Sequence, residues 1–406
     1  MASHTTTRAH RGGRGGLDSR ASERLAAAGA DTSTAAVTAT ASAVERYELA
    51  SQWQLVRRSF LRHRAALAGL VALALFYLVA LFPEFLAPHD PYQRNSGFID
   101  ARPQRVRLFH DGRPVRPFVY AMVKSVDPVT LERVYTDDPS RRLPLRLLVR
   151  GDEYRFWNLV PARVHLFGVD ESDGGHRLFL FGSDNLGRDL FSRVIYATRV
   201  SMSIGLVGVA VSFVLGSLFG GLSGYLGGRI DVIIQRVIEF LLAIPKIPLW
   251  MALAAALPPG WDPVKLYFGM TIILSLVGWT QIARVVRGKI ISLREEDFVA
   301  AARIGGAGTG AILLRHLLPG FLSYLIVSLT LAVPQMILAE TALSFLGLGL
   351  QPPAISWGVL LQDAQAIRSI ALQPWLLIPG LFVTVAVLAF NFVGDGLRDA
   401  SDPYSQ

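Results

Sequence analysis

Residues 200–228 read VSMSIGLVGVAVSFVLGSLFGGLSGYLGG, and none of these 29 side chains is charged. The stretch lies between Arg199 and Arg229, the nearest charges on either side. An α-helix needs about 20 predominantly apolar residues to cross the hydrocarbon core of a bilayer. Helices in soluble cores rarely run so far without a charge, so this stretch predicts a membrane-spanning helix.

Four more charge-free runs have a similar length. They cover residues 65–83, 266–283, 317–339 and 369–394, which is 19, 18, 23 and 26 residues. A further apolar segment, Val232–Leu257, is interrupted by three charges and two prolines: Arg236, Glu239, Lys246, Pro245 and Pro248. When this segment is counted as the third span, the sequence predicts an all-α polytopic membrane protein with six transmembrane helices.

The bulk composition agrees with a membrane protein. Of the 406 residues 51% are hydrophobic, and the mean hydropathy is +0.39. The net charge of +9 comes almost wholly from arginine, because only four of the 40 basic residues are lysines. We expect these cations to set the membrane topology rather than bind nucleic acid, since no stripe of interleaved basic and aromatic residues accompanies them. With no cysteine in the chain, disulfides, thiolate metal sites and thiol nucleophiles are excluded.

The placement of arginine predicts the orientation of the spans. Four arginines crowd the start of the first span: Arg57, Arg58, Arg62 and Arg64. Cytoplasmic flanks of spans are enriched in Lys and Arg, and six spans from this point put the basic segment 284–320 on the same side. We therefore predict a multi-pass protein with both termini in the cytoplasm.

Two tails flank the predicted spans. Residues 1–44 are rich in Ala, Thr, Ser, Gly and Arg and have no apolar period, which predicts a disordered cytoplasmic tail. Residues 45–63 are expected to form an amphipathic helix at the inner membrane surface, before a first span over 64–86. A five-helix core over 197–396 precedes the second tail, residues 397–406.

Residues 87–196 are predicted to form a small β-rich extracytoplasmic insertion that leads into the second span. Polar and apolar residues alternate over five runs: 105–109, 115–120, 145–149, 164–169 and 177–181. Asp111-Gly112 and the segment 173–175 supply turns between these runs.

Between the fourth and fifth spans, residues 295–319 read EEDFVAAARIGGAGTGAILLRHLLP. Carboxylates at the start suit a helix N-terminus, and Gly305 and Gly306 permit the positive φ that ends a helix. Pro319 suits the first turn of the next helix, which is the fifth span. The pattern predicts two short helices joined by a glycine turn, although an ordinary amphipathic linker would account for the same residues.

This segment resembles the "EAA" signature of the permeases of bacterial ABC importers: E-A-A, three residues, G, nine residues, and a hydrophobic-x-L-P ending. Five residues fall on the signature at the right spacing: Ala301, Ala302, Gly306, Leu318 and Pro319. Ala300 stands where the signature has Glu, and His316 stands where it has a hydrophobic residue.

Three other stretches resemble the dipeptide/oligopeptide/nickel branch of these permeases. They are FGSDNLGRDLFSR at 181–193, LSFLGLGLQPPAISWG at 343–358 and GDGLRD at 394–399. Residues 52–90 resemble the N-terminal segment of the C-type permease subunit of that branch. The likeness covers about 54–90 and 178–404, and the insertion between them is longer than the family usually has.

The resemblance implies an ABC type I importer-like permease subunit in the bacterial inner membrane, which translocates a peptide-like or other small polar solute. Its loop, 284–320, would form a coupling helix against a cytoplasmic ATPase. The residues expected to carry this role are Glu296, Asp297, Ala301, Ala302, Gly306, Arg315, Leu318 and Pro319. The expected partners are a homologous second permease, two ATPase subunits or domains, an extracytoplasmic binding protein and the lipid bilayer, with no nucleic acid.

We expect no enzymatic activity, cofactor or metal on this chain. No G-x-x-x-x-G-K-[ST] loop is present to bind nucleotide phosphates, and neither H-E-x-x-H nor G-x-S-x-G occurs. ATP hydrolysis is therefore expected on separate chains.

Three ionisable residues lie in or near predicted spans: Glu239, Lys246 and Glu340. Such groups usually face the protein interior or water, which makes them candidates for the translocation pathway or its gate. Glu239 could instead pair with Arg236 at the interface. Two other classes of protein remain open: an ion-coupled secondary transporter, which should show internal repeats and mid-span carboxylates, and a membrane-anchored protein that acts through its outer β domain.

Overall fold

A computed structural model describes residues 57, 59–129, 133–169, 177–258 and 260–401. The chain forms two units, Met1–Ser59 and Phe60–Gln406, and the elements below belong to the second. The predicted tail 1–44, most of the predicted amphipathic helix, the turn at 173–175 and residues 402–406 lie outside the described residues. Of the second tail, 397–401 continue a helix.

The five charge-free runs all coincide with helices. They are α3 (Arg64–Leu81), α5 (Leu190–Leu226), α8 (Pro263–Leu293), α12 (Leu322–Phe345), and a 3₁₀ turn at Pro374–Leu377 that continues into α15 (Ile378–Ser401). Within the described part of the chain these five are long and apolar enough to cross a membrane, or six with a bent pair counted as one span.

The bent pair replaces the continuous third span predicted over 232–257. Helices α6 (Gly228–Ala243) and α7 (Lys246–Ala255) meet at 90°. The break has a local cause, since the residue before a proline is pushed out of the helical region. Ile244, which precedes Pro245, is accordingly extended with ψ 131°.

Two span boundaries differ from the prediction. The segment predicted as one span over 64–86 is divided at Phe82, after which Pro83 begins the short helix α4 (Pro83–Leu86). The second span begins earlier than expected, because Asp189 caps α5 by accepting a hydrogen bond from the Ser192 amide at 2.8 Å. The last seven residues of the predicted insertion are therefore the start of α5.

The insertion contains two antiparallel sheets. Strands β1 (Arg107–His110), β2 (Arg113–Val126) and β3 (Arg133–Pro144) form one in that order, and β4 (Arg146–Phe156) and β5 (Val160–Gly168) form the other. Asp111-Gly112 makes the β1–β2 turn, as predicted, with φ of 51° and 73°.

The strand predicted over 177–181 is wrong. No strand forms there among the described residues, because the segment is held through a side chain instead. The backbone amide of Phe179 donates to the side-chain oxygen Oε1 of Gln104 at 2.7 Å. The backbone amide of Gln104 donates to the Phe179 carbonyl oxygen at 2.9 Å.

The segment predicted as the loop 284–320 also differs from expectation. Helix α8 continues to Leu293, and the loop elements follow it: α9 (Asp297–Ile304), α10 (Thr309–Ala311), a π-helical turn at Ile312–Leu317 and α11 (Leu318–Gly320). Pro319 therefore belongs to α11, and the fifth span begins at Leu322, beyond a break at Phe321.

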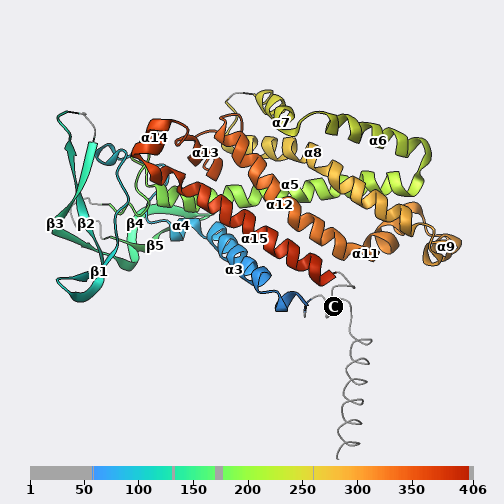
Figure 1. Cartoon of the computed structure of the whole chain (residues 1–406), viewed down its shortest axis with the longest axis horizontal. Helices are drawn as coiled ribbons and strands as arrows, with labels where there is room; N and C mark the ends of the chain where they lie inside the picture. Colours follow the sequence, from blue (N-terminus) through green and yellow to red (C-terminus); the bar gives the residue numbers. More distant parts are fainter. Residues whose placement is uncertain (1–56, 58, 130–132, 170–176, 259, 402–406) are drawn as a thin grey trace, which may run out of the picture. The chain divides into compact units, whose positions relative to one another are not determined.

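Helix α5 is central to the helical core. It packs against α8, α12 and α3, while α15 packs against both α3 and α12. Short helices α13 (Trp357–Gln362) and α14 (Ile367–Leu372) complete the segment between α12 and α15. The strands lie at one end of this core, called here the strand end, and α9 lies at the other, called here the α9 end (Figure 1).

Candidate functional site

Helix α9 is attached to the core by one side of its short length. Val299 is fully buried in a cluster with Ile290 at the end of α8 and Ile312 of the π-helical turn. The opposite side is exposed, with Phe298 45% and Ile304 88% accessible. An apolar surface of this kind at the end of a membrane protein is typical of a contact with another chain.

The residues predicted for coupling gather around this helix. Glu296 is its N-cap and Asp297 its first residue. Ala302 and Leu318 are half-buried against the cluster that holds Val299. The other six are exposed: Glu296, Asp297, Ala301, Gly306, Arg315 and Pro319.

Gly306 has the conformation that the glycine turn predicted. Its φ is +80°, and a Cβ added there would meet nothing within 4 Å. Only the backbone angle therefore requires glycine at this position.

A bidentate ion pair near the α9 end was not predicted from the sequence. Arg287 of α8 donates from Nε and Nη2 to the two carboxylate oxygens of Asp231 on α6, both at 2.7 Å. Arg303 of α9 donates to the Tyr225 hydroxyl at 3.3 Å. These contacts connect α9, α8 and the α5–α6 corner. The sequence showed Asp231 and Arg287 only as separate charges, so their pairing could not be predicted.

Among the helices lies a cavity of about 290 Å³, lined by α5, α7, α8 and α12. Lys246 is on its wall together with Trp250 and Tyr324, and the amides of Gln281 and Gln335 also line it. A cation, two amides and the hydroxyls of Ser212 and Ser328 among apolar side chains can bind a carboxylate and peptide groups.

The other two predicted pathway residues lie elsewhere. Glu239 is on α6, where Arg236 donates to it at 2.8 Å, and both side chains are more than half exposed. The structure thus contains the pairing that the sequence offered as the alternative for Glu239.

Glu340 is completely buried in α12 and lines neither of the two cavities described here. Ser344 and Ser201 donate to its carboxylate at 2.8 Å and 3.4 Å. The two serine hydroxyls in turn accept from the amides of Leu350 and Trp357, at 3.0 Å and 3.1 Å. The carboxylate thereby connects α5, α12 and the segment that follows α12.

A larger cavity, of about 790 Å³, lies at the strand end between the β4–β5 hairpin, α5, the start of α8 and the segment after α12. Aromatic and charged side chains share its wall: Glu84, Asp90, Tyr92, Tyr154, Trp157, Tyr196, Arg199, Tyr267 and Phe268. The sequence did not predict this cavity, because its walls come from residues as far apart as Glu84 and Ile355.

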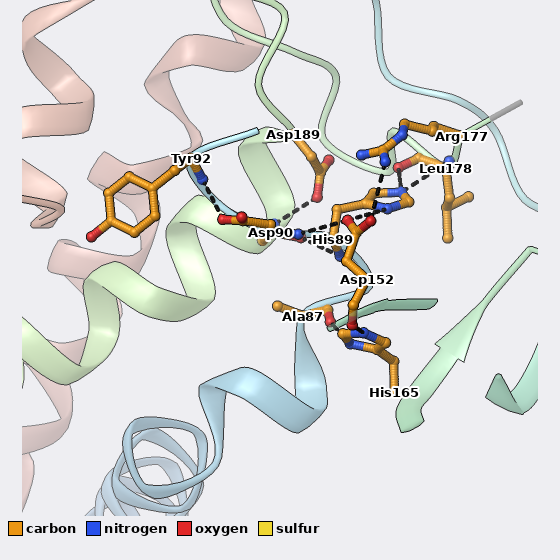
Figure 2. A network of polar contacts seen from close by, with 10 residues as sticks. Ala87, His89, Asp90, Tyr92, Asp152, His165, Arg177, Leu178 and Asp189 are labelled. Atoms are coloured by element: carbon orange, nitrogen blue, oxygen red, sulfur yellow. Dashed lines mark hydrogen bonds and ion pairs between the residues drawn. The ribbon is translucent and has the colours of Figure 1, made fainter. Parts of the chain in front are cut away.

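A polar network joins the insertion to α5 beside this cavity (Figure 2). Asp152 of β4 accepts from Arg177 at 3.2 Å and from the Asp90 amide at 3.1 Å. His89 Nε2 lies 3.1 Å from the Leu178 carbonyl oxygen and accepts from the Leu178 amide at 3.2 Å.

Burial shifts two groups of this network. Desolvation, helped by the positive charge of Arg177, lowers the pKa of His89 to about 4. Desolvation raises the pKa of Asp189 to about 7, against the hydrogen bonds that the carboxyl receives from Ser192. His89 is therefore neutral at pH 7, and the network holds together without a charged histidine.

Comparison with known proteins identifies the family. The profile described as "Binding-protein-dependent transport system inner membrane component" matches residues 216–404, and the "N-terminal TM domain of oligopeptide transport permease C" matches residues 51–103. A dipeptide transport system permease protein of Bacillus subtilis is 40% identical over 61% of this chain and 71% of its own length. The chain belongs to the family of inner membrane components of binding-protein-dependent transport systems.

Further relatives of this permease subunit carry related names. The oligopeptide transport system permease proteins of Bacillus subtilis and Haemophilus influenzae are 37% and 38% identical, over 55% and 61% of this chain and 71% and 74% of their own lengths. Among solved structures, a chain of the MetNI methionine ABC transporter in an inward-facing conformation is 16% identical, with a TM-score of 0.42 over 52% of this chain and 97% of that chain.

Family membership confirms two of the sequence predictions. The chain is a multi-pass membrane component of a transport system. It is a permease subunit and not an enzyme.

Proposed function

We propose that the chain is the permease subunit of an ATP-binding-cassette importer for peptides. The names of its relatives, which are dipeptide and oligopeptide permeases, support the cargo class. The observation that carries the coupling role is the α9 segment, which is fixed to the core through Val299 and exposes Phe298 and Ile304.

We propose six spans in a type I importer-like arrangement, with the α6–α7 pair as the third and the α9 end in the cytoplasm. The supporting observation is charge: six basic residues lie on or beside the segment that includes α9, namely Arg284, Arg287, Lys289, Arg294, Arg303 and Arg315. In this orientation the strand end faces the extracytoplasmic binding protein.

The mechanism follows from how α9 is attached. A cytoplasmic ATPase that binds the exposed face of α9 would move this helix together with Val299. Val299 is buried with Ile290 of α8 and Ile312 of the π-helical turn. Movement of α9 is thereby passed to the ends of α8 and α12. One ATPase for each of two homologous permeases would make the movement symmetric.

The cavity that Lys246 lines is the proposed part of the translocation pathway. Its ammonium group suits the terminal carboxylate of a peptide, and the amides of Gln281 and Gln335 suit peptide bonds. Weak, multiple contacts of this kind let a polar cargo enter and leave. Glu340 would act at a distance, by holding the segment after α12 in place.

The coupling role is tested with two glycine variants that differ in backbone angle alone. Gly306 has φ +80° and Gly308 has φ −71°, and neither has an atom within 4 Å of an added Cβ. Gly306→Val strains the turn, at a cost of about 1–3 kcal/mol, and should reduce peptide uptake at least tenfold in proteoliposomes with the partner subunits. Gly308→Val should leave uptake within about twofold of the parent.

The amount of each variant in the membrane and the ATPase subunits that copurify with it are measured in parallel. Normal uptake with Gly306→Val at full assembly would contradict the coupling role. Uptake driven by an ion gradient without any ATPase would favour the secondary transporter instead.

A further inference from the structure

The turn between β4 and β5 has an unusual composition. Trp157 and Asn158 both have positive φ, 49° and 58°, and Leu159 completes the three-residue turn. Asparagine tolerates this region, whereas a bulky residue such as tryptophan rarely adopts it. A conformation of this kind persists only where surrounding contacts determine it.

Those contacts hold the turn at the end of a span. Trp157 Nε1 donates to the carbonyl oxygen of Leu81, the last residue of α3, at 3.0 Å. Phe156 stacks on Phe82 with the ring centres 5.6 Å apart. Figure 1 shows β4 and β5 beside α4, at the strand end of α3.

A charged pair fixes the same point from α5. Arg199 donates to both carboxylate oxygens of Glu84, at 2.6 Å and 2.8 Å, and its guanidinium lies 4.2 Å from the centre of the Trp157 ring. Glu84 ends the first charge-free run of the sequence, and Arg199 precedes the second. Both mark the level at which apolar side chains give way to charges, so Trp157 lies at the membrane boundary.

Apolar side chains are exposed both on α3 and on the hairpin. Val71, Leu75 and Leu78, spaced by four and three residues, are 52–60% exposed on one side of this span. On the hairpin, Leu159 of the turn is 80% exposed and Val160, the first residue of β5, is 59% exposed. Because Trp157 is bound to Leu81, these exposed apolar side chains lie beside the end of the helix that carries the stripe.

We propose that the β4–β5 turn inserts Leu159 and Val160 into the outer surface of the lipid bilayer, at the boundary between head groups and acyl chains. Tryptophan is enriched at this level of membrane proteins. Arg155, exposed on the strand next to the turn, suits the phosphates of the head groups. The partner is the phospholipid bilayer itself, and the inference rests on α3 as a span and on the orientation proposed above, whatever the cargo.

The inference is tested with single cysteines, since the chain has none of its own. Leu159→Cys is labelled with an environment-sensitive fluorophore in the full complex in proteoliposomes. Leu147→Cys is the matched control, because Leu147 lies on the same hairpin and is 77% exposed. The strand partner of Leu147, Phe167, packs on Phe191 of α5. Phe191 lies eight residues, or about 12 Å, before Arg199 along α5. Position 147 is therefore expected to lie farther from the membrane than position 159.

Lipids with a nitroxide near the head group should quench the label at position 159 at least threefold more than the label at position 147. Equal quenching at the two positions would overturn the inference. So would a label at position 159 that is shielded both from the nitroxide lipids and from aqueous iodide, because that result would indicate a covering protein. Since Leu159 is a surface side chain, the substitution leaves the core intact, and copurification of the partner subunits checks assembly.

Discussion

At the strand end, buried charges find their partners within the chain. Arg193, which is 2% exposed, pairs with the fully buried Asp184, and the Glu84–Arg199 pair closes with two hydrogen bonds. Helix α9 at the other end is arranged differently, because its apolar side chain Ile304 is 88% exposed. The strand end thus pairs its buried charges within the chain, whereas α9 leaves an apolar side chain exposed.

This difference indicates where the chain depends on other proteins. A buried ion pair that loses one partner leaves an uncompensated charge, so the strand end should be sensitive to single substitutions. The exposed face of α9, with Phe298 and Ile304, has few internal contacts to lose, and substitutions there should alter interactions with another chain instead. Stability should thus depend on the strand end and coupling on the α9 end.

The strongest way to break this comparison is to remove Asp184. Arg193 and Arg188 both pair with this carboxylate, the latter at 2.7 Å, and the amides of Leu186 and Arg188 also donate to it. Asp184→Ala should cost about 3–5 kcal/mol in the free energy of unfolding, because the buried Arg193 loses its nearer partner and keeps only Asp363 at 3.9 Å. Thermal unfolding in nanodiscs and the amount of protein in membranes measure the loss.

The control is an exposed pair of the same insertion. Arg163 donates to Glu153 at 2.8 Å, with both side chains more than half exposed. Glu153→Ala should change stability by no more than about 1 kcal/mol. A similar loss from both substitutions would contradict the view that burial makes the strand end sensitive.

A pair of glycine substitutions compares the two ends directly. Gly187 and Gly306 have φ of +73° and +80°, but a Cβ at Gly187 would overlap the backbone of Asn95, whereas Gly306 faces open space. Gly187→Ala should therefore destabilise by about 2–4 kcal/mol, through strain and overlap together. Gly306→Ala should cost only about 1 kcal/mol, from the backbone angle. Equal shifts of the unfolding midpoint would show that packing does not distinguish the two ends.

Titration of His89 sharpens the comparison with pH. Its pKa is lowered to about 4 from 6.5, mainly by burial, so the unfolded chain binds the proton more readily. Stability from this residue is complete above pH 6.5 and is lost as the pH falls toward 4, by up to about 3 kcal/mol. His89→Gln keeps groups that can donate to and accept from Leu178, and it should flatten this loss in unfolding midpoints from pH 7 to 4.

Asp189 provides the opposite sign as a control. Its pKa is raised to about 7 from 3.8, so its contribution is complete below pH 3.8 and is lost as the pH rises through 7. Asp189→Asn should remove that loss. Parallel pH profiles for the parent and both variants would show that neither group is linked to folding.

The smallest expected effect tests whether internal pairing extends from the strand end into the helical core. Glu340→Ala leaves the hydroxyls of Ser201 and Ser344 without their acceptor, at a cost of about 1–3 kcal/mol. Glu340→Gln retains an acceptor oxygen and should recover most of the loss. If both variants unfold like the parent, the buried carboxylate does not hold the segment after α12.

The spans could be predicted because their signal is local. Each charge-free run lies within one stretch of sequence, and a bilayer core of fixed thickness sets its length. The glycine turn at Gly306 was equally local, since one residue supplies the positive φ. Pro245 even marked the position of the break between α6 and α7, although the proline itself does not give the 90° angle.

The rest depended on which distant segments meet. Glu84 and Arg199 were visible as the charges that bound two runs, yet nothing local indicated that they pair with each other across 115 positions. The alternation at 177–181 resembled a strand, but the segment binds Gln104 of a distant stretch. Pairings of this kind, and the cavity that they enclose, are properties of packing rather than of sequence pattern.

Helix α5 links the two ends in a mechanical sense. Its 37 residues make an uninterrupted rod about 55 Å long, which exceeds the roughly 30 Å of the hydrocarbon core. A tilt of about 5° around its midpoint would displace each end by about 2 Å in opposite directions. Because α5 is capped at Asp189 and leads directly into α6 at the other end, such a tilt would move both the end of the insertion and the start of α6. A movement at one end of α5 therefore has a geometric counterpart at its other end.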